Sequence, residues 1–343
     1  MIQSIKTVGK YLDQPLLLSK FKKAVPPVFI GGATLFCANE IDKAPQEEKR
    51  HTAIYQGSII AATVASALAA PRIASKIVGK AYDKYCKKDI VKRNIALVDG
   101  YLKENKVNAG VKNILEKAKD KVLSLKEIKT LKNDITSSEA GKDLLNKLIP
   151  EPENITSKDI RNEIGRLSIL GFVPVAGGVV GGIAGEKMSD GKITKKNVGN
   201  RIKEGSYQYL ANIFMCNIGA GLALAGMEKA KIKSRSARAL GMVGGIVTTG
   251  IIGGSTIANY IGKKLINPLF DSKTKEERKK EKLNSERKPE LIDICLHSDD
   301  IATIAVMSGL KWIEPALPIL YGVSGYRAGI GYRNGKKKTD LNA

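Results

Sequence analysis

The sequence predicts an all-α, polytopic helical membrane protein with glycine-zipper helix packing and a small helical soluble block. Three observations predict this fold class: long charge-free stretches recur, glycine reaches 34 of the 343 residues while aromatics are only 5%, and the net charge is +23. Low aromatic content with abundant glycine is typical of membrane helices that approach one another closely. The excess of Lys and Arg favours anionic partners, such as lipid head groups.

Charge-free stretches form the basis of the membrane prediction. A membrane helix needs about 20 predominantly apolar residues, and the first stretch falls just short of that length. A soluble amphipathic helix would show charged residues every few positions, so apolarity all round indicates burial in lipid or in a large core. The five stretches are Ala24–Asn39, Thr52–Pro71, Leu167–Gly185, Gly205–Met227 and Ala239–Gly262.

A sixth apolar stretch, Ile301–Tyr326, is different because it carries Lys311 and Glu314 near its middle. Pro315 follows, so we expect one helix to end near Glu314 and a second segment to start at the proline. Ionisable groups inside a membrane are costly and usually pair or serve transport, and residues at i, i+3 can pair with each other. The stretch is either a broken or re-entrant membrane segment carrying this pair, or two helices that lie on a surface.

Between the apolar stretches, residues 73–166 read as short amphipathic helices of a soluble block. Ser124–Glu127 and Thr136–Glu139 match capping boxes, and a proline-rich turn precedes a helix start at Thr156 or Ser157. The predicted divisions are 1–72 (arm and first hairpin), 73–166 (soluble block), 167–264 (glycine-rich membrane helices), 265–300 (charged linker) and 301–343 (broken segment and basic tail).

The stretch Gly171–Lys192 could hold a nucleotide loop or a packed helix face. No three of its glycines match the i, i+2, i+5 spacing of a dinucleotide loop, and no Walker A motif is present. Glycines four residues apart instead form a flat strip on one helix face, which permits close backbone approach. We therefore predict helix packing through Gly177, Gly181 and Gly185 against the stretch Ala239–Gly262. The predicted contact residues there are Gly241, Gly245, Thr249 and Gly253.

Catalytic and metal-binding motifs are weak. Only two histidines occur, and the cluster around Cys295 and His297 has no distant ligand pair to complete a site. The segment Asp190–Thr194 lacks the ligands of a calcium loop and is better read as a helix-ending turn. We therefore predict no enzyme activity, no catalytic residue, no metal and no cofactor.

Lysines before the first apolar stretch favour a first hairpin with both ends inside, which places residues 73–166 in the cytoplasm. The later loops are all basic, so charge does not orient the remaining spans. Three arrangements stay open: several true spans, shallow or re-entrant insertion, or the buried core of a soluble protein. The mean hydropathy of -0.14 is compatible with the last of these.

The resulting functional prediction is an integral membrane protein, expected in a bacterial inner membrane. Its role would be membrane organisation, or a pore or carrier built by close-packed glycine-rich helices. The predicted partners are a bilayer with anionic head groups and further copies of the chain. The alternative is a peripheral or soluble basic protein that binds anionic lipid or nucleic acid. Nucleic acid is less favoured because no recognition motif accompanies the charge.

Overall fold

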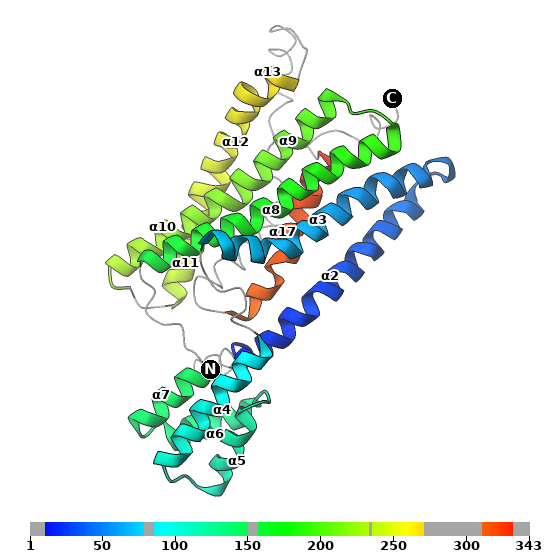
Figure 1. Cartoon of the computed structure of the whole chain (residues 1–343). Helices are drawn as coiled ribbons and strands as arrows, with labels where there is room; N and C mark the ends of the chain where they lie inside the picture. The colour runs from blue at the N-terminus through cyan, green and yellow to red at the C-terminus, as the bar shows by residue number, and fades with distance from the viewer. Residues whose placement is uncertain (1–10, 79–85, 150–156, 233–234, 271–310, 332–343) are drawn as a thin grey trace. The chain divides into compact units, whose positions relative to one another are not determined.

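A computed structural model describes the chain except for residues 1–10, 79–85, 150–156, 233–234, 271–310 and 332–343 (Figure 1). Every regular element in the described part is helical and no strand occurs there, which confirms the all-α prediction. Contacts divide the chain into two compact units. The first comprises Met1–Pro26, Ala81–Thr156 and Ala305–Ala316, and the second comprises Pro27–Lys80, Ser157–Ile304 and Leu317–Ala343.

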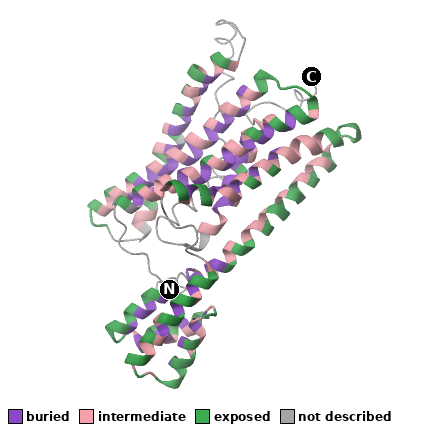
Figure 2. Ribbon diagram, viewed as in Figure 1, coloured by how far each residue is buried: buried purple, intermediate pink, exposed green. Residues whose placement is uncertain are grey.

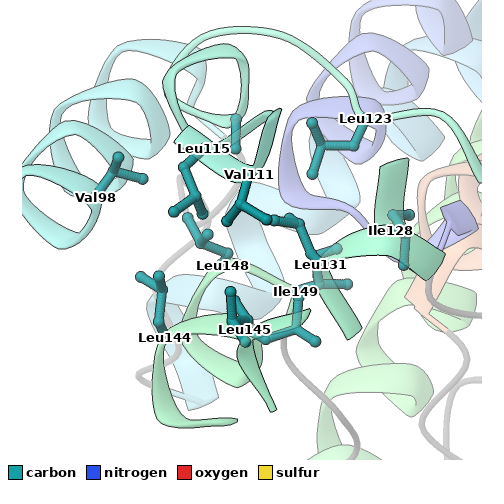
Figure 3. Close-up of a cluster of buried hydrophobic side chains, with 12 residues drawn as sticks. Val98, Val111, Leu115, Leu123, Ile128, Leu131, Leu144, Leu145, Leu148 and Ile149 are labelled. Carbon is teal, nitrogen blue, oxygen red and sulfur yellow. The ribbon is translucent and has the colours of Figure 1, made fainter. Parts of the chain in front are cut away.

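The first unit is built from four short amphipathic helices and the start of α2 (Pro15–Lys43). The four helices are α4 (Lys87–Glu104), α5 (Ala109–Ala118), α6 (Leu125–Ile135) and α7 (Glu139–Leu148). Their apolar faces meet in one core of branched aliphatic side chains (Figure 3). Burial of these side chains provides the main stabilisation of the unit, as in a soluble helical domain. The labelled core residues are Val98, Val111, Leu115, Leu123, Ile128, Leu131, Leu144, Leu145, Leu148 and Ile149.

Helix caps in this unit follow the sequence in one case and differ in another. The capping box at Ser124 is confirmed, because its hydroxyl accepts from the Glu127 amide and the Glu127 carboxylate accepts from the Ser124 amide. The second predicted box, Thr136–Glu139, does not form. Thr136 ends α6, and Ser138 caps α7 by accepting from the Gly141 amide at 3.1 Å.

The N-terminal arm packs with the soluble block. The buried Gln14 amide donates to the Leu123 carbonyl and accepts from the Leu123 amide, both at 2.8 Å. The side-chain amide of Gln14 thus pairs with both backbone groups of Leu123, in the same way as a backbone amide of a neighbouring strand would. The pairing leaves this buried polar side chain hydrogen-bonded. The unit therefore combines residues up to Pro26 with Ala81–Thr156, whereas the predicted divisions separated the arm from the block.

The second unit is a bundle of long helices (Figure 1). Three of its helices are the later part of α2, α3 (Lys49–Val78), which the short η1 (Gln46–Glu48) precedes, and α8 (Ser157–Asp190). A fourth long helix consists of α9 (Lys195–Tyr209), the π-helical η2 (Leu210–Phe214) and α10 (Met215–Lys229). A fifth consists of α11 (Arg235–Gly245), η3 (Ile246–Gly254), α12 (Ser255–Ile261), η4 (Gly262–Ile266) and α13 (Asn267–Phe270).

Five helices among the described residues are long and apolar enough to cross a membrane. The first qualifies although its charge-free run is short, because α2 extends well beyond that run on both sides. The charged residues that border this charge-free stretch thus belong to the same helix as the stretch itself. The five ranges are Pro15–Lys43, Gln46–Val78, Ile160–Asp190, Lys195–Lys229 and Ala237–Phe270.

The last described helix is short. A 3-10 segment, η6 (Lys311–Ala316), contains Pro315 and leads into α17 (Leu317–Ile330). A new helix therefore starts close to the predicted position, two residues after the proline. Residues 301–310, which would form the helix predicted to end near Glu314, lie outside the described residues. At about 1.5 Å per residue its 14 residues span roughly 21 Å, less than a bilayer core of about 30 Å.

The turn after α8 is also as predicted. The helix ends at Asp190, and Gly191 adopts a φ of 72°, a left-handed conformation that favours glycine and commonly ends helices.

Candidate functional site

Glycines bring α8 against α3. A side-chain carbon added at Gly177 would lie under 3.0 Å from Ser66, and one at Gly181 would lie equally close to Ala62. At Gly185 it would meet the Tyr55 carbonyl at 2.9 Å. The contact therefore runs along both helices in antiparallel order, and it continues to a hydrogen bond between the His51 and Asp190 side chains at the helix ends.

The predicted partner of this strip is wrong, because α3 covers it rather than Ala239–Gly262. That stretch instead packs antiparallel on the helix before it in the chain, with Gly245 against Gly219 and Gly250 against Cys216. The short connection between the two long helices lets them fold back on one another. Spacing of four residues identifies a packing face, but it does not identify the helix that covers that face.

The other predicted residues of this stretch have different neighbours. A side-chain carbon at Gly241 would clash with the Met227 side chain, and Thr249 lies beside Gly219. At Gly253 the same carbon would meet only the Thr248 carbonyl of its own helix, at 3.6 Å. Gly253 therefore makes no close contact with another described helix, and Gly250 and Gly254, on the adjacent face, lie at the interface instead.

A second face of α8 packs on α17. Added carbons at Gly178 and Gly182 would lie under 3.0 Å from the carbonyl oxygens of Gly325 and Gly329. These α17 glycines were not predicted as packing residues, although their spacing of four is visible in Leu317–Ile330. With α3 on one face and α17 on the next, α8 is the central helix of the unit.

Large apolar side chains cover the outside of the bundle. Leu35 is 73% exposed, Leu240 72% and Leu222 65%, and buried polar side chains lie inside. Figure 2 shows α2 largely exposed or half-buried along its later part. The interior of the bundle is itself largely apolar, with side chains such as Leu167, Ile213 and Leu224 buried, so the buried polar residues lie among apolar ones. Other exposed apolar residues of the bundle include Val28, Phe172, Val180, Val243, Ile252, Ile257 and Leu269.

Arg201 lies at the centre of a buried network that joins four helices. Its guanidinium pairs with Glu186 of α8 and donates to the Gly329 carbonyl of α17 at 3.0 Å and to the Tyr55 hydroxyl of α3 at 3.1 Å. Glu186 also accepts from Asn197, at 3.0 Å. Arg201 is 4% exposed and Glu186 2%. A buried ion pair needs such additional hydrogen bonds to offset its desolvation.

Polar residues continue along the same helix beyond Arg201. Asn212 donates to Gln208 at 3.0 Å, and Gln208 donates to Glu204 at 2.8 Å. All are buried, and Glu204 and Gln208 are 0% exposed. We name Arg201, Glu204, Gln208 and Asn212 the polar column. It extends about 17 Å along the helix axis, just over half of a bilayer core of about 30 Å.

The polar column ends in a π-helical segment. Asn212 lies in η2, and the Cys216 thiol donates to the Ala211 carbonyl at 3.1 Å. Gly254 of the facing helix, itself part of the π-helical η3, packs on Ala211. Short π-helical insertions are rare and frequently occur at functional sites.

The polar column was not predicted from the sequence, where Glu186 and Glu204 only border the charge-free stretches. The structure buries both because α8 and α9 continue past the runs and are covered there by α3 and α17. A polar residue at every third or fourth position from Arg201 to Asn212 was the available signal.

The predicted pair of Lys311 and Glu314 stays a prediction. Both residues lie in η6, Glu314 is half-buried, and the side chain of Lys311 is outside the described residues. Cys295 and His297 are likewise outside the described residues.

The chain matches no protein-family model, and neither the curated proteins nor the solved structures contain a significant match to it.

Proposed function

We propose that the chain is an integral membrane protein, without enzymatic activity, in which the polar column forms a pathway or binding site for a small polar solute. The observation that carries the proposal is the apolar outer surface of the second unit. Large apolar side chains cover this surface, and charged and amide side chains are buried within an otherwise apolar interior. In water, exposed apolar surface of this extent would favour aggregation, whereas in lipid it is the stable arrangement.

The glycine contacts support the membrane part of this proposal. Glycine destabilises a helix in water by about 1 kcal/mol relative to alanine. In lipid, close backbone approach through small residues drives helix association, so the glycine contacts of α8 would act as a zipper. The apolar outer surface of the bundle also disfavours the alternative of a peripheral or soluble basic protein.

The polar column supports the transport part. Ionisable and amide side chains at membrane depth are expensive and commonly mark solute pathways. Membrane organisation remains the second candidate, in which the same hydrogen bonds would serve only to hold the helices together.

The location in a bacterial inner membrane, the cytoplasmic placement of residues 73–166 and self-association are parts of the same proposal. Lys20, Lys22 and Lys23 precede the apolar part of α2, so the positive-inside rule favours a cytoplasmic soluble block. Cysteine labelling in intact cells tests this placement. A cysteine introduced at the exposed Lys112 should react with a permeant maleimide and stay protected from an impermeant one.

Membrane integration is tested by alkaline carbonate extraction of a membrane fraction that contains the full chain. We expect the chain to stay in the pellet, because buried helices resist extraction while electrostatic attachment does not. Quantitative release into the supernatant would contradict the membrane proposal.

The pathway is tested by solute flux into proteoliposomes, followed by light scattering with glycerol, urea and KCl as probes. We expect flux of at least one probe above protein-free liposomes. Gln208→Leu should reduce it by about tenfold or more, since it interrupts the polar column. Leu222→Ala, on the exposed apolar face, is the control and should not change flux. Circular dichroism verifies folding, and Gln208→Asn offers a milder polar variant. Absence of flux for all three probes would favour membrane organisation instead.

A further inference from the structure

A basic hollow of about 450 Å³ lies in the first unit, between the start of α2, the first residue of α4 and the end of α5. This volume lies within the range of small-molecule sites, which is about 300–1,000 Å³. Four of its eight lining residues are lysines, and a single acid, Asp120, opposes them. The lysines are Lys20, Lys87, Lys117 and Lys121.

Three of these lysines are available to a ligand. Lys117 pairs with Glu127 at 2.6 Å, whereas Lys20, Lys87 and Lys121 form no ion pair with any described residue. Lys87 is also the first residue of the 18-residue helix α4, whose N-cap, Cys86, makes no side-chain capping hydrogen bond. The positive end of the α4 dipole adds to the ammonium groups at this rim, and Asp89 in the first turn of α4 opposes it.

The hollow also lies close to the apolar part of α2. Lys20 precedes Ala24, where the charge-free stretch begins, by four residues of one continuous helix, or about 6 Å. Leu16 and Val122 add apolar lining. A hollow with several cations and apolar walls beside a membrane-length helix has the composition of a site for a phosphate group that carries an apolar chain.

We propose that this hollow binds a phosphate mono- or diester anion, held by Lys20, Lys87 and Lys121. Two sources share this chemistry: the head group of an anionic phospholipid and a soluble phosphate. The inference does not depend on the polar column or on transport.

The test uses the full chain in neutral detergent and two probes. Inorganic phosphate is titrated by calorimetry at constant ionic strength, and phosphatidylglycerol is compared with phosphatidylcholine by native mass spectrometry. The variant K20Q/K121Q should weaken binding by about tenfold or more. The control K129Q/K142Q removes the same charge from exposed positions elsewhere in the unit and should change binding little.

The outcomes distinguish a phospholipid head group from a soluble phosphate, or they exclude the proposed site. Preference for phosphatidylglycerol without phosphate binding identifies a lipid head group, and saturable phosphate binding identifies a soluble anion. Equal losses in the two double variants would reduce the effect to net charge and overturn the proposal, as would binding of neither probe. K20R/K121R, which keeps both charges, should retain binding and excludes misfolding as the cause of a loss.

Discussion

At Gly178, any side chain larger than hydrogen would meet the backbone of Gly325 on α17. The obstacle is a carbonyl group, which cannot move aside as a flexible side chain can. Single residues therefore matter most where two helices meet at a glycine. At such a position an added methyl group would prevent the helices from packing in contact.

We predict that Gly178→Ala destabilises the bundle by about 1–3 kcal/mol, because overpacking forces the α8 and α17 backbones apart. Thermal unfolding in detergent, followed by circular dichroism, measures the effect. Gly226→Ala on α10 is the matched control, since a carbon added there has nothing within 4 Å. The control should be neutral or slightly stabilising, because alanine favours helix. Equal stability of the two variants would contradict a close contact at Gly178.

At the scale of elements, Glu127 at the start of α6 has two roles. It completes the capping box with Ser124 and forms an ion pair with Lys117. Burial alone would raise the pKa of Glu127, but hydrogen bonds from Lys117 and Ser124 outweigh it and lower the pKa to about 2. A carboxylate with a lowered folded pKa stabilises the fold above its unfolded pKa. That contribution is lost as the pH falls through the folded value.

We therefore predict that the first unit loses stability as the pH falls from about 4.5 towards 2, with Glu127 as one contributor. Glu127→Gln should be less stable than the wild type at pH 7 and should lose less stability on acidification. Urea unfolding of the full chain, with hydrogen exchange read at α6, provides the measurement. Parallel pH curves for the variant and the wild type would exclude the role of Glu127. Glu139→Gln, which has no comparable capping partner, is the control.

The sequence predicted the lengths of the helices well and their packing partners poorly. Charge-free runs identified helices long enough to cross a membrane, because apolar length is a local property. The partner of the α8 strip was wrong, because tertiary contacts depend on how the connecting segments return. The burial of Glu204 was not predicted for a related reason: it depends on helices that are distant in the chain, and these leave no trace in local spacing.

For the whole molecule, the two units differ in their surfaces. The first surrounds an aliphatic core with charged residues, whereas the second exposes large apolar side chains and buries an arginine, carboxylates and amides within an apolar interior. We therefore expect the two units to unfold separately, so that a single unfolding temperature does not describe the chain.

We predict that Leu131→Ala destabilises the first unit by about 2–5 kcal/mol, because it leaves a cavity in the aliphatic core. Hydrogen exchange of the full chain in detergent should show faster exchange in α4–α7 only. Amides of α8 should be unaffected, since distant sites contribute independently. Matching acceleration in both units would show that they unfold together. Leu222→Ala, which removes an exposed side chain, should leave α4–α7 unchanged.

The packing of α17 against α8 has a consequence for biosynthesis. During translation, α3 and α8 can pair as soon as Asp190 has been made. The face of α8 that carries Gly178 and Gly182 then stays uncovered until the ribosome reaches Ile330. A nascent chain thus passes through a stage in which this glycine face of α8 has no covering helix. At that stage Arg201 also lacks its hydrogen-bond partner Gly329. We expect incorrect helix pairing to be most frequent between the synthesis of Asp190 and that of Ile330. A chaperone that covers α8 would act during this interval.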